Sequence, residues 1–544
     1  MAGSGDSSAF GNGSFQGSGG TFAGSSSSFD GGTSFTVAGG VGSVSWTMAE
    51  IVESSGALTR TAQLMQPLID RLASERRWLG AAVAGTFNYP GDAMDALVFA
   101  EWRCGAACSR IEILAQKANQ AAANYAAAEA NNANAAALAA RLAALGQGLH
   151  AWRAGPLAPV MAGLDLLNWL EVAKRQGLRD AMESALNNGG AYAAGTLGPS
   201  MVILYLLAQL RRRDTQPAGS VPAFRLRKFF DGAGMVRPGR LSVRPVPAQD
   251  WDPAAAGHFQ PGHANSLDGQ PWTMDATFES MLGGSNDAYG YPPGSIGVVR
   301  VERPDGTNAW VVHLPGTEDW SVLDSTNPFD MEGNLEGLTA AQQEEFEQQK
   351  VLVQELIKEA LRSAGAQPGE DVVLTGHSGG GIHAAAAAAS PAFLADVNVK
   401  MIVIAGSPAR NMAVGNGIAV LELENENDIV TAADFGPPSP RQNWVTVTSH
   451  RPPVAGSAVE VVEQAHSLDN YMEDAAELDG SSDPALQASR ETLRNILGVS
   501  AAGAAAGAGI AGTKWVYQGR DNNKPRAKPG PPPVKGKDFP PGSR

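Results

Sequence analysis

The chain has 544 residues, of which 43% are hydrophobic and 17% are charged, and its formal net charge is −15 at pH 7. This length and composition predict roughly two or three globular domains with sizeable cores. The acidic balance argues against a nucleic-acid partner, because phosphate backbones are bound by clustered basic residues. The two cysteines, Cys104 and Cys108, are too few for a disulfide scaffold, and we expect both to be free thiols.

Residues 1–44 are rich in glycine and serine and carry almost no charge. Such a composition cannot bury enough apolar surface to order itself, so the sequence predicts a disordered tether. The segment also lacks the basic start and the apolar core of a signal peptide. We therefore expect no cleavable secretory signal in this segment.

Residues 45–214 predict an all-α domain. Apolar residues recur near helical spacing over 47–82, and an alanine-rich helix is expected over 93–145. A turn at 85–92, containing a Pro-Gly pair, separates the two stretches. The first two helices are therefore expected to form an antiparallel hairpin.

The segment 191–210 consists of uncharged residues and is followed by three arginines. Its length and basic flank are typical of a membrane-spanning helix. Gly195, Gly198 and Pro199 interrupt it, however, and the strongly apolar part covers only its second half. We favour a helix buried among its neighbours and retain the membrane-spanning helix as the alternative.

From residue 215 the pattern changes twice. Residues 215–290 are rich in proline, glycine and tryptophan and predict a linker that merges into an irregular start of the next domain. Residues 291–499 alternate strand and helix patterns, which predicts an α/β domain with a largely parallel sheet. An amphipathic helix is expected over 339–364 within this domain. Residues 500–544 become rich in proline and lysine and predict a disordered tail.

The most informative motif is Gly376-His-Ser-Gly-Gly380. It stands between a short apolar run and an alanine-rich stretch, which is the strand, sharp turn and helix that a nucleophile elbow requires. Ser378 is therefore the predicted nucleophile. The backbone N–H of Gly379, at the start of the helix, is a predicted donor to the oxyanion.

A serine nucleophile needs a base to take its proton and an acid to orient that base. On this fold, acid and base follow the serine in that order. Asp428, in a turn after the strand expected at 420–423, is the preferred acid, and His466, at a loop-to-helix junction, is the preferred base. The competing acids are Glu424, Glu426 and Asp434, and the competing base is His450.

A second oxyanion donor is expected from the loop after an earlier strand. The strand predicted at 310–314 runs into Pro315-Gly-Thr-Glu318. Gly316 lets the backbone approach closely, and Thr317 can offer both its N–H and its hydroxyl. The sequence thus predicts an oxyanion hole formed by Thr317 and Gly379.

Residues 290–497 resemble the class 3 (fungal triacylglycerol lipase-like) lipases of the α/β-hydrolase superfamily. The matching residues are His313 to Thr317, Gly376 to Gly380, Gly406-Ser-Pro408, Asn425 to Val430, and His466 with Tyr471. The resemblance implies hydrolysis of carboxylic esters, often of lipids, without a cofactor. The alternatives are a non-catalytic secreted scaffold with a hydrolase-like module and a membrane-anchored esterase.

The helical half resembles the WXG-type substrates of type VII secretion in actinobacteria. Trp78-Leu-Gly80 stands near the hairpin turn, and Tyr125-Ala-Ala-Ala-Glu129 stands on the second helix. The resemblance implies export to the cell envelope or beyond, the alternative being a cytoplasmic location. It also implies a secretion chaperone or partner helical hairpin that binds residues 45–145. An effector role, with an immunity protein as a further partner, is the hypothesis that follows.

Overall fold

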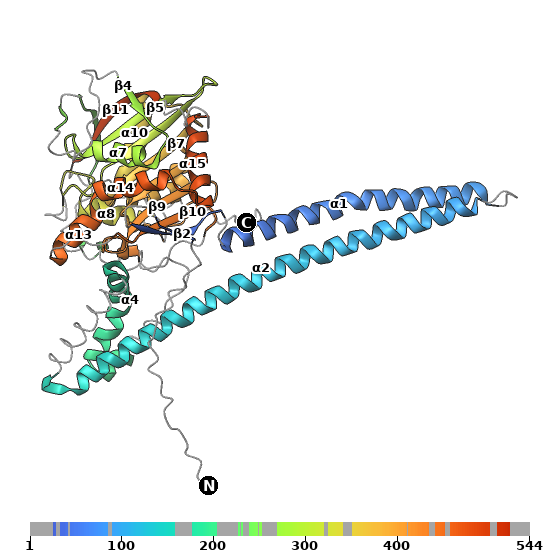
Figure 1. Cartoon of the computed structure of the whole chain (residues 1–544), viewed down its shortest axis with the longest axis horizontal. Helices are drawn as coiled ribbons and strands as arrows, with labels where there is room; N and C mark the ends of the chain where they lie inside the picture. Colours follow the sequence, from blue (N-terminus) through green and yellow to red (C-terminus); the bar gives the residue numbers. More distant parts are fainter. Residues whose placement is uncertain are drawn as a thin grey trace, which may run out of the picture. The chain divides into compact units, whose positions relative to one another are not determined.

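The computed structural model describes residues 25–28, 33–41, 44–84, 90–157, 177–203, 227–228, 230–231, 239–247, 250–252, 269–319, 325–340, 351–410, 412–434, 441–451, 457–500 and 509–522. The chain divides into two compact units (Figure 1). The helical unit comprises Met1–Phe22, Thr47–Ala158 and Gly190–Tyr205. The sheet unit comprises Ala23–Trp46, Pro159–Gly189 and Leu206–Arg544.

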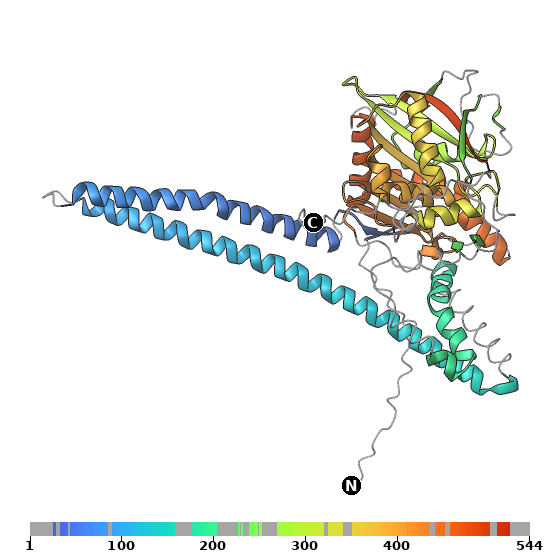
Figure 2. The same cartoon turned by 180° about the vertical axis from the view of Figure 1, so that it is seen from behind.

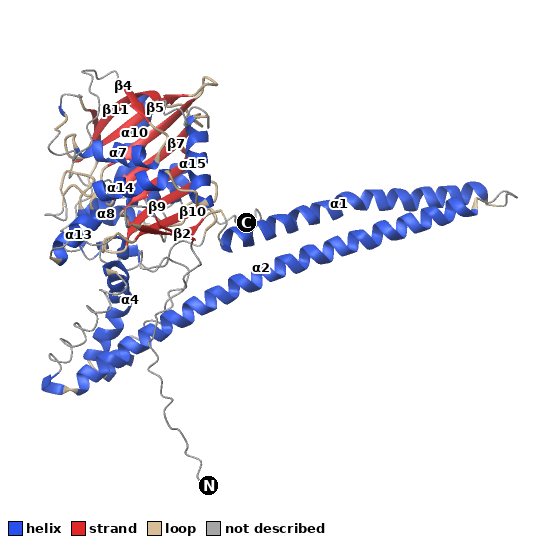
Figure 3. Ribbon diagram, viewed as in Figure 1, coloured by secondary structure: helices blue, strands red, loops and turns tan. Residues whose placement is uncertain are grey.

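Two long helices, α1 (Val44–Val83) and α2 (Gly91–Arg153), dominate the helical unit (Figure 3). They run antiparallel, since residues later in α1 contact residues earlier in α2. The pairs are Ser55 Oγ with the Ala115 carbonyl oxygen (2.8 Å), Cys108 Sγ with the Ala62 carbonyl oxygen (3.5 Å), and Arg76 Nε with Glu101 Oε2 (2.8 Å). Both cysteines are free thiols, as expected.

The apolar segment 191–210 does not form one continuous helix over its described part. Helix α4 (Leu178–Thr196) ends within it, and Gly198 adopts a left-handed backbone with φ of 94° before a second helical stretch begins. Residues 204–210 lie outside the described residues. In the part of the chain that the structure describes, no helix is both long and apolar enough to span a membrane.

The strands of the sheet unit form one mixed sheet. Its centre is a row of parallel strands, in spatial order β6 (Asn308–Leu314), β7 (Asp371–His377), β8 (Asn398–Ala405), β9 (Ala419–Asn425) and β10 (Trp444–Ser449). Antiparallel strands flank the centre: β5 (Ser295–Glu302), β11 (Ile510–Asp521), β3 (Leu241–Pro245) and β4 (Gln270–Met274) beyond β6, and β2 (Ser34–Gly39) and β1 (Ser25–Ser28) beyond β10. The carboxyl ends of the parallel strands therefore meet at one edge, where sites form in α/β proteins.

Helices cover both faces of this sheet, which Figures 1 and 2 show from opposite sides. One face packs against α7 (Phe278–Tyr289), α14 (Leu468–Asp479) and α15 (Pro484–Leu497). The other packs against α10 (Leu352–Ala364), α11 (Gly379–Ala389) and α12 (Pro391–Leu394). Successive strand residues point to opposite faces, so Val373 joins the first layer and Leu374 the second. This is the α/β architecture that the alternating pattern predicts.

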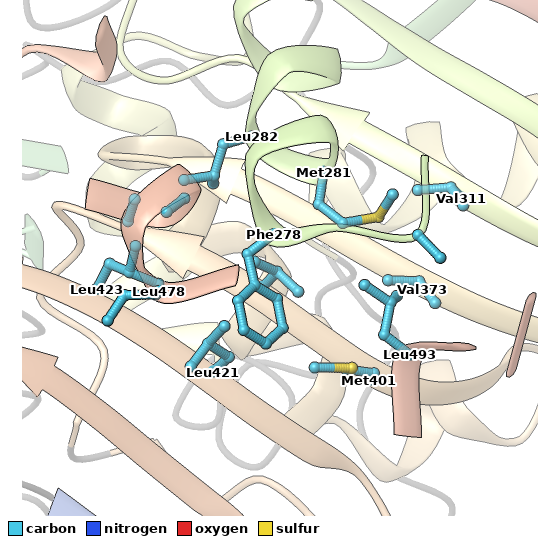
Figure 4. Close-up of a cluster of buried hydrophobic side chains, with 14 of the residues drawn as sticks. Phe278, Met281, Leu282, Val311, Val373, Met401, Leu421, Leu423, Leu478 and Leu493 are labelled. Carbon is cyan, nitrogen blue, oxygen red and sulfur yellow. The ribbon is translucent and has the colours of Figure 1, made fainter. Parts of the chain in front are cut away.

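Helix α7 lies over the middle of the first face. Phe278, Met281 and Leu282 are fully buried there, and Figure 4 shows Phe278 pointing toward Leu421 and Met401 on the strands beneath. Complete burial of such a side chain contributes about 1.5–3 kcal/mol. The packing fixes the C-terminal end of α7, which reaches the candidate site.

The predicted disorder of residues 1–44 is wrong for 34–39. These residues form β2, which pairs antiparallel with β10. Phe35 and Val37 alternate with more exposed neighbours and are buried in the layer that contains α15. Without β2, this edge of β10 would be unpaired, so β10 supplies hydrogen-bond partners for the backbone of residues 34–39. A partner so far along the chain leaves no trace in local composition.

The expected disordered tail and irregular linker also contain ordered structure. Strand β11 lies within 500–544 and pairs with β5 on one edge and with β3 and β4 on the other. Its Lys514 is fully buried, forms an ion pair with Asp287 of α7 and lies 4.0 Å from the ring centre of Trp272. Residues 270–289, assigned to the linker, supply β4 and α7. Pairing with distant strands thus orders segments whose local composition gives little indication of secondary structure.

Two further boundaries differ from the sequence-based expectations. Thr339 is the C-terminal cap of α8 (Met331–Leu338), and the next described helix, α10, begins only at Leu352, so 339–364 is not one helix; residues 341–350 lie outside the described residues. Residues 177–189, placed in the helical domain by their pattern, belong to the sheet unit. They belong there because Arg179 forms buried ionic contacts with Glu424 and Asp434 of the sheet unit.

Candidate active site

Ser378 occupies a sharp turn between β7 and α11. Its φ of 52° and ψ of −120° make it the one non-glycine residue with a positive φ among those that the structure describes. Such a conformation costs on the order of 1–3 kcal/mol and persists only where the surroundings impose it. The Ser378 N–H donates to the Ala405 carbonyl oxygen at 2.9 Å, and Ser407 Oγ donates to the Ser378 carbonyl oxygen at 2.8 Å. The strand–turn–helix predicted for the motif is therefore present.

Glycine is required on both sides of this turn. A Cβ on Gly376 would overlap the backbone of Gly380, and a Cβ on Gly380 would overlap the Pro315 carbonyl group. Both obstacles are backbone atoms, which cannot move aside as a flexible side chain could. Glycines are therefore needed at positions 376 and 380 because the end of β7, the start of α11 and the loop at Pro315 pack backbone against backbone.

The structure brings the predicted base and acid to Ser378. His466 ends α13 (Ala458–His466), and its Nε2 lies 2.9 Å from Ser378 Oγ. Its Nδ1 lies 2.8 Å from Oδ2 of Asp428, in the turn after β9. Ser378 and Asp428 are buried, whereas the His466 side chain keeps 18% of its surface exposed. The imidazole can therefore hold a proton toward Asp428 and accept one from the serine hydroxyl.

Asp428 has donors besides His466. The Tyr471 hydroxyl donates to Oδ2 at 2.7 Å, and the Val430 N–H donates to Oδ1 at 2.9 Å. Burial and the negative charge of Asp428 raise the pKa of Tyr471 well above its usual value, so the phenol stays protonated and donates. Tyr471 is one of the residues that carry the family resemblance, but the sequence alone indicated no role for it.

The competing candidates have partners elsewhere. Glu424 forms a buried ion pair with Arg410 and lies 3.1 Å from Nε of Arg179. Glu426 Oε2 lies 2.8 Å from Nδ1 of His450, whose Nε2 is 2.7 Å from Thr36 Oγ1. His450 is thus engaged with two other groups, and His466 is the histidine hydrogen-bonded to Ser378. The last competitor, Asp434, is buried beside the two arginines.

The carboxylates of Glu422, Glu424 and Asp434 lie close enough together to be considered as a metal site. Arg410 and Arg179, however, contribute two buried positive charges at the same place. Burial and the neighbouring Glu424 raise the pKa of Glu422 to about 8, which favours its neutral form near pH 7. Charge balance within this cluster therefore needs no cation.

The loop expected to supply the second oxyanion donor lies beside the elbow. A Cβ placed on Gly379 would stand 3.2 Å from the Thr317 nitrogen and 2.8 Å from its hydroxyl oxygen. Asn334 of α8 donates from Nδ2 to Thr317 Oγ1 at 2.7 Å. The Thr317 hydroxyl thus accepts a hydrogen bond from Asn334, and a hydroxyl that accepts also carries an O–H that can donate. Asn334 was not found by sequence reasoning, because nothing local marks its contact with Thr317.

A hydrogen-bond chain connects this loop with the base. The Gly316 N–H donates to the Tyr289 hydroxyl oxygen at 2.7 Å, and that hydroxyl lies 3.0 Å from Nδ1 of His377. Nε2 of His377 lies 2.9 Å from the His466 carbonyl oxygen. Burial, with a smaller contribution from the charge of His466, lowers the pKa of His377 to about 3. A neutral His377 can accept from Tyr289 and donate to the His466 carbonyl group.

A serine at a strand-to-helix elbow, with a histidine and a carboxylate at the carboxyl edge of a parallel sheet, is the arrangement of serine hydrolases with an α/β fold. Residues 329–506 match the model of the family described as the PGAP1-like alpha/beta domain. This match supports an α/β-hydrolase domain in the C-terminal half, with lipase- or esterase-like hydrolase activity. No curated protein and no solved structure matches the chain.

Proposed function

We propose that the protein is a serine hydrolase that acts on lipids or other carboxylic esters. One observation carries the proposal: the His466 ring lies between Ser378 Oγ, at 2.9 Å, and Asp428 Oδ2, at 2.8 Å. The three residues stand in the chain order that this fold uses. The family match supports the hydrolase class but does not extend to the roles of individual residues.

In the proposed reaction, Ser378 Oγ attacks the ester carbonyl carbon while His466 Nε2 takes the hydroxyl proton. The N–H groups of Gly379 and Thr317 stabilise the oxyanion of the tetrahedral intermediate, each contributing about 3–4 kcal/mol. His466 then gives its proton to the leaving alcohol, and the acyl group remains on Ser378. A water molecule then attacks the acyl-enzyme carbonyl carbon while His466 takes its proton. His466 returns this proton to Ser378 Oγ as the bond between the acyl group and Ser378 breaks, which releases the carboxylic acid and restores the serine.

The test uses p-nitrophenyl esters of increasing chain length together with covalent labelling by a fluorophosphonate. Ser378→Ala should abolish both hydrolysis and labelling. Ser363→Ala, on the exposed side of α10, is the matched control and should retain both. Undiminished hydrolysis by Ser378→Ala would contradict the proposal. Absence of activity and labelling in the wild type would instead favour the non-catalytic scaffold.

We further propose that the helical unit docks a partner helical hairpin or a secretion chaperone and directs export by a type VII-like route. Apolar side chains left exposed on its two helices support a docking role. Trp78 and Trp102 are each 67% exposed, and Phe99 is 56% exposed. Phe99 and Trp102 lie on the same helix with their ring centres 6.1 Å apart, and large apolar groups exposed together are typical of interaction sites.

Export can be tested by the distribution of the full chain between culture medium and cells in a host that has the secretion system. Trp78→Ala should reduce the exported fraction, whereas Ser378→Ala should leave it unchanged. Equal export of Trp78→Ala and wild type would contradict a role for this surface. If the exported enzyme acts on other cells, an effector role and a protective immunity protein follow.

A further inference from the structure

The loop that carries Asp428 is held from outside the sheet by the first residues of α4. The Arg179 N–H donates to the Glu426 carbonyl oxygen at 2.9 Å, two residues before Asp428. Nε of Arg179 donates to Thr431 Oγ1 at 3.0 Å, three residues after Asp428. Arg179 thus contacts the loop on both sides of the candidate acid.

Thr431 passes this contact on to Asp428 itself. Its Oγ1 accepts from Arg179 and donates to the Asp428 carbonyl oxygen at 3.0 Å. The Asp428 N–H in turn donates to the Asn425 carbonyl oxygen at 3.0 Å. The backbone of the acid is therefore hydrogen-bonded on both sides, and one of these bonds depends on a hydroxyl that Arg179 orients.

The guanidinium of Arg179 is anchored by buried charge. Its side chain is 3% exposed and lies 3.1 Å from Glu424 Oε2 and 2.8 Å from Glu183 Oε2. Burial disfavours its charge, but Glu424 and the other neighbouring carboxylates more than offset this and raise its pKa above the usual value. A buried, paired guanidinium has few alternative positions, so its donors point in fixed directions.

Gly177, two residues before Arg179, also allows a close contact with the loop that carries Asp428. Gly177 has a φ of 88°, and a Cβ there would stand 2.6 Å from the Glu426 carbonyl oxygen and 3.2 Å from Glu426 Cβ. A side chain at this position would push Arg179 away from the loop. Residues 177–179 therefore lie directly against the loop that carries Asp428.

We propose that Arg179 is a positioning residue that holds the Asp428 loop in the geometry required by His466. The proposal rests on the esterase function proposed above. Arg179 lies far upstream of the segment that matches the PGAP1-like family, 329–506. The active site is therefore completed by a segment outside that match, at the start of the helix whose last residues belong to the helical unit.

The test compares full-length Arg179→Ala, Arg179→Lys and Thr431→Val with wild type, using kcat, KM and melting temperature with a soluble p-nitrophenyl ester. Ser184→Ala is the matched control, because Ser184 is exposed on the same helix and its hydroxyl accepts a hydrogen bond from Asn188. Arg179→Ala should lower kcat by about 10- to 100-fold with little change in KM, since misplaced catalytic groups cause losses of this size. The kcat of Arg179→Lys should lie between those of Arg179→Ala and wild type, and the kcat of Ser184→Ala should stay within about twofold of wild type.

Two readouts separate positioning from mere support of the fold. Added methylguanidinium should restore part of the kcat of Arg179→Ala, because it can occupy the vacated ionic site. If Arg179→Ala does not fold, Thr431→Val decides, since it keeps the side-chain shape and removes the bridging hydroxyl; its kcat should fall several-fold. A folded Arg179→Ala, or a Thr431→Val, with wild-type kcat would overturn the proposal. Retained activity in Ser378→Ala would overturn the esterase function and this proposal together.

Discussion

The Tyr471 hydroxyl donates to Oδ2 of Asp428 at 2.7 Å, the same oxygen that lies 2.8 Å from Nδ1 of His466. Tyr471 is fully buried on α14, so its position is set by packing against the sheet. One carboxylate oxygen is thereby held between a phenol and an imidazole. The orientation of the base depends on this shared oxygen.

Tyr471→Phe should keep the packing and remove one donor to the buried carboxylate. We expect kcat to fall roughly tenfold and the free energy of unfolding to decrease by about 1.5–3 kcal/mol, as for a lost hydrogen bond to a charged group. Steady-state kinetics and urea unfolding at pH 7 measure both effects. An unchanged kcat would show that His466 and the backbone alone orient Asp428.

Gly406→Ala should damage the site through space and backbone strain together. Gly406 has a φ of 61°, and a Cβ there would stand 2.9 Å from the Tyr471 ring, 3.2 Å from Asp428 Oδ2 and 3.3 Å from His466 Nδ1. We expect at least a tenfold loss of kcat and a lower melting temperature. Gly417→Ala is the control, because a Cβ at Gly417 meets no atom within 4 Å. Equal activity of the two variants would contradict the close packing at Gly406.

Asn334→Ala should release the Thr317 hydroxyl from its 2.7 Å hydrogen bond. If this hydroxyl and the adjacent N–H stabilise the oxyanion, kcat should fall about 10- to 100-fold while KM changes little, since the interaction is made mainly in the transition state. Asn334→Asp, which cannot donate in its ionised form, should show a loss of similar direction. A change confined to KM would place Asn334 in substrate binding instead.

His383 should make stability depend on pH. It is buried on α11 without a hydrogen-bond partner among the described residues, and burial lowers its pKa to about 3. A lowered folded-state pKa means that the unfolded chain binds the proton first, so this contribution is complete above pH 6.5 and is lost as the pH falls toward 3. Between pH 6.5 and 5, wild type should lose about 2 kcal/mol more than His383→Leu, at about 1.4 kcal/mol per pH unit.

Urea unfolding of both proteins at pH 7 and pH 5 measures this difference, and other titrating groups cancel in the comparison. The Phe329 ring packs edge-to-face on His383 at 5.5 Å and should tolerate leucine. Parallel loss of stability in the two proteins would show that His383 is protonated in the folded state or reached by water.

Sequence reasoning reached the candidate nucleophile, acid and base because each carries a local signal. The elbow needs glycines at fixed offsets from Ser378, and the chain order of acid and base on this fold limited the search to a few residues. The choice of His466 over His450 and of Asp428 over its neighbours agrees with the hydrogen bonds that the structure contains. Alternating strand and helix patterns likewise predicted an α/β domain.

Other features depended on contacts between distant segments. Strands β2 and β11 lie within segments whose overall composition predicted disorder, and both are paired with neighbouring strands of the sheet. Arg179 reaches the Asp428 loop from 252 residues upstream of Thr431. A motif and a helical period are written in neighbouring residues, so the sequence by itself determined the elbow, the order of the candidate triad and the fold class. Only the tertiary structure decided which remote donors hold that triad, because hydrogen bonds and strand pairing between distant segments form only when the chain has folded.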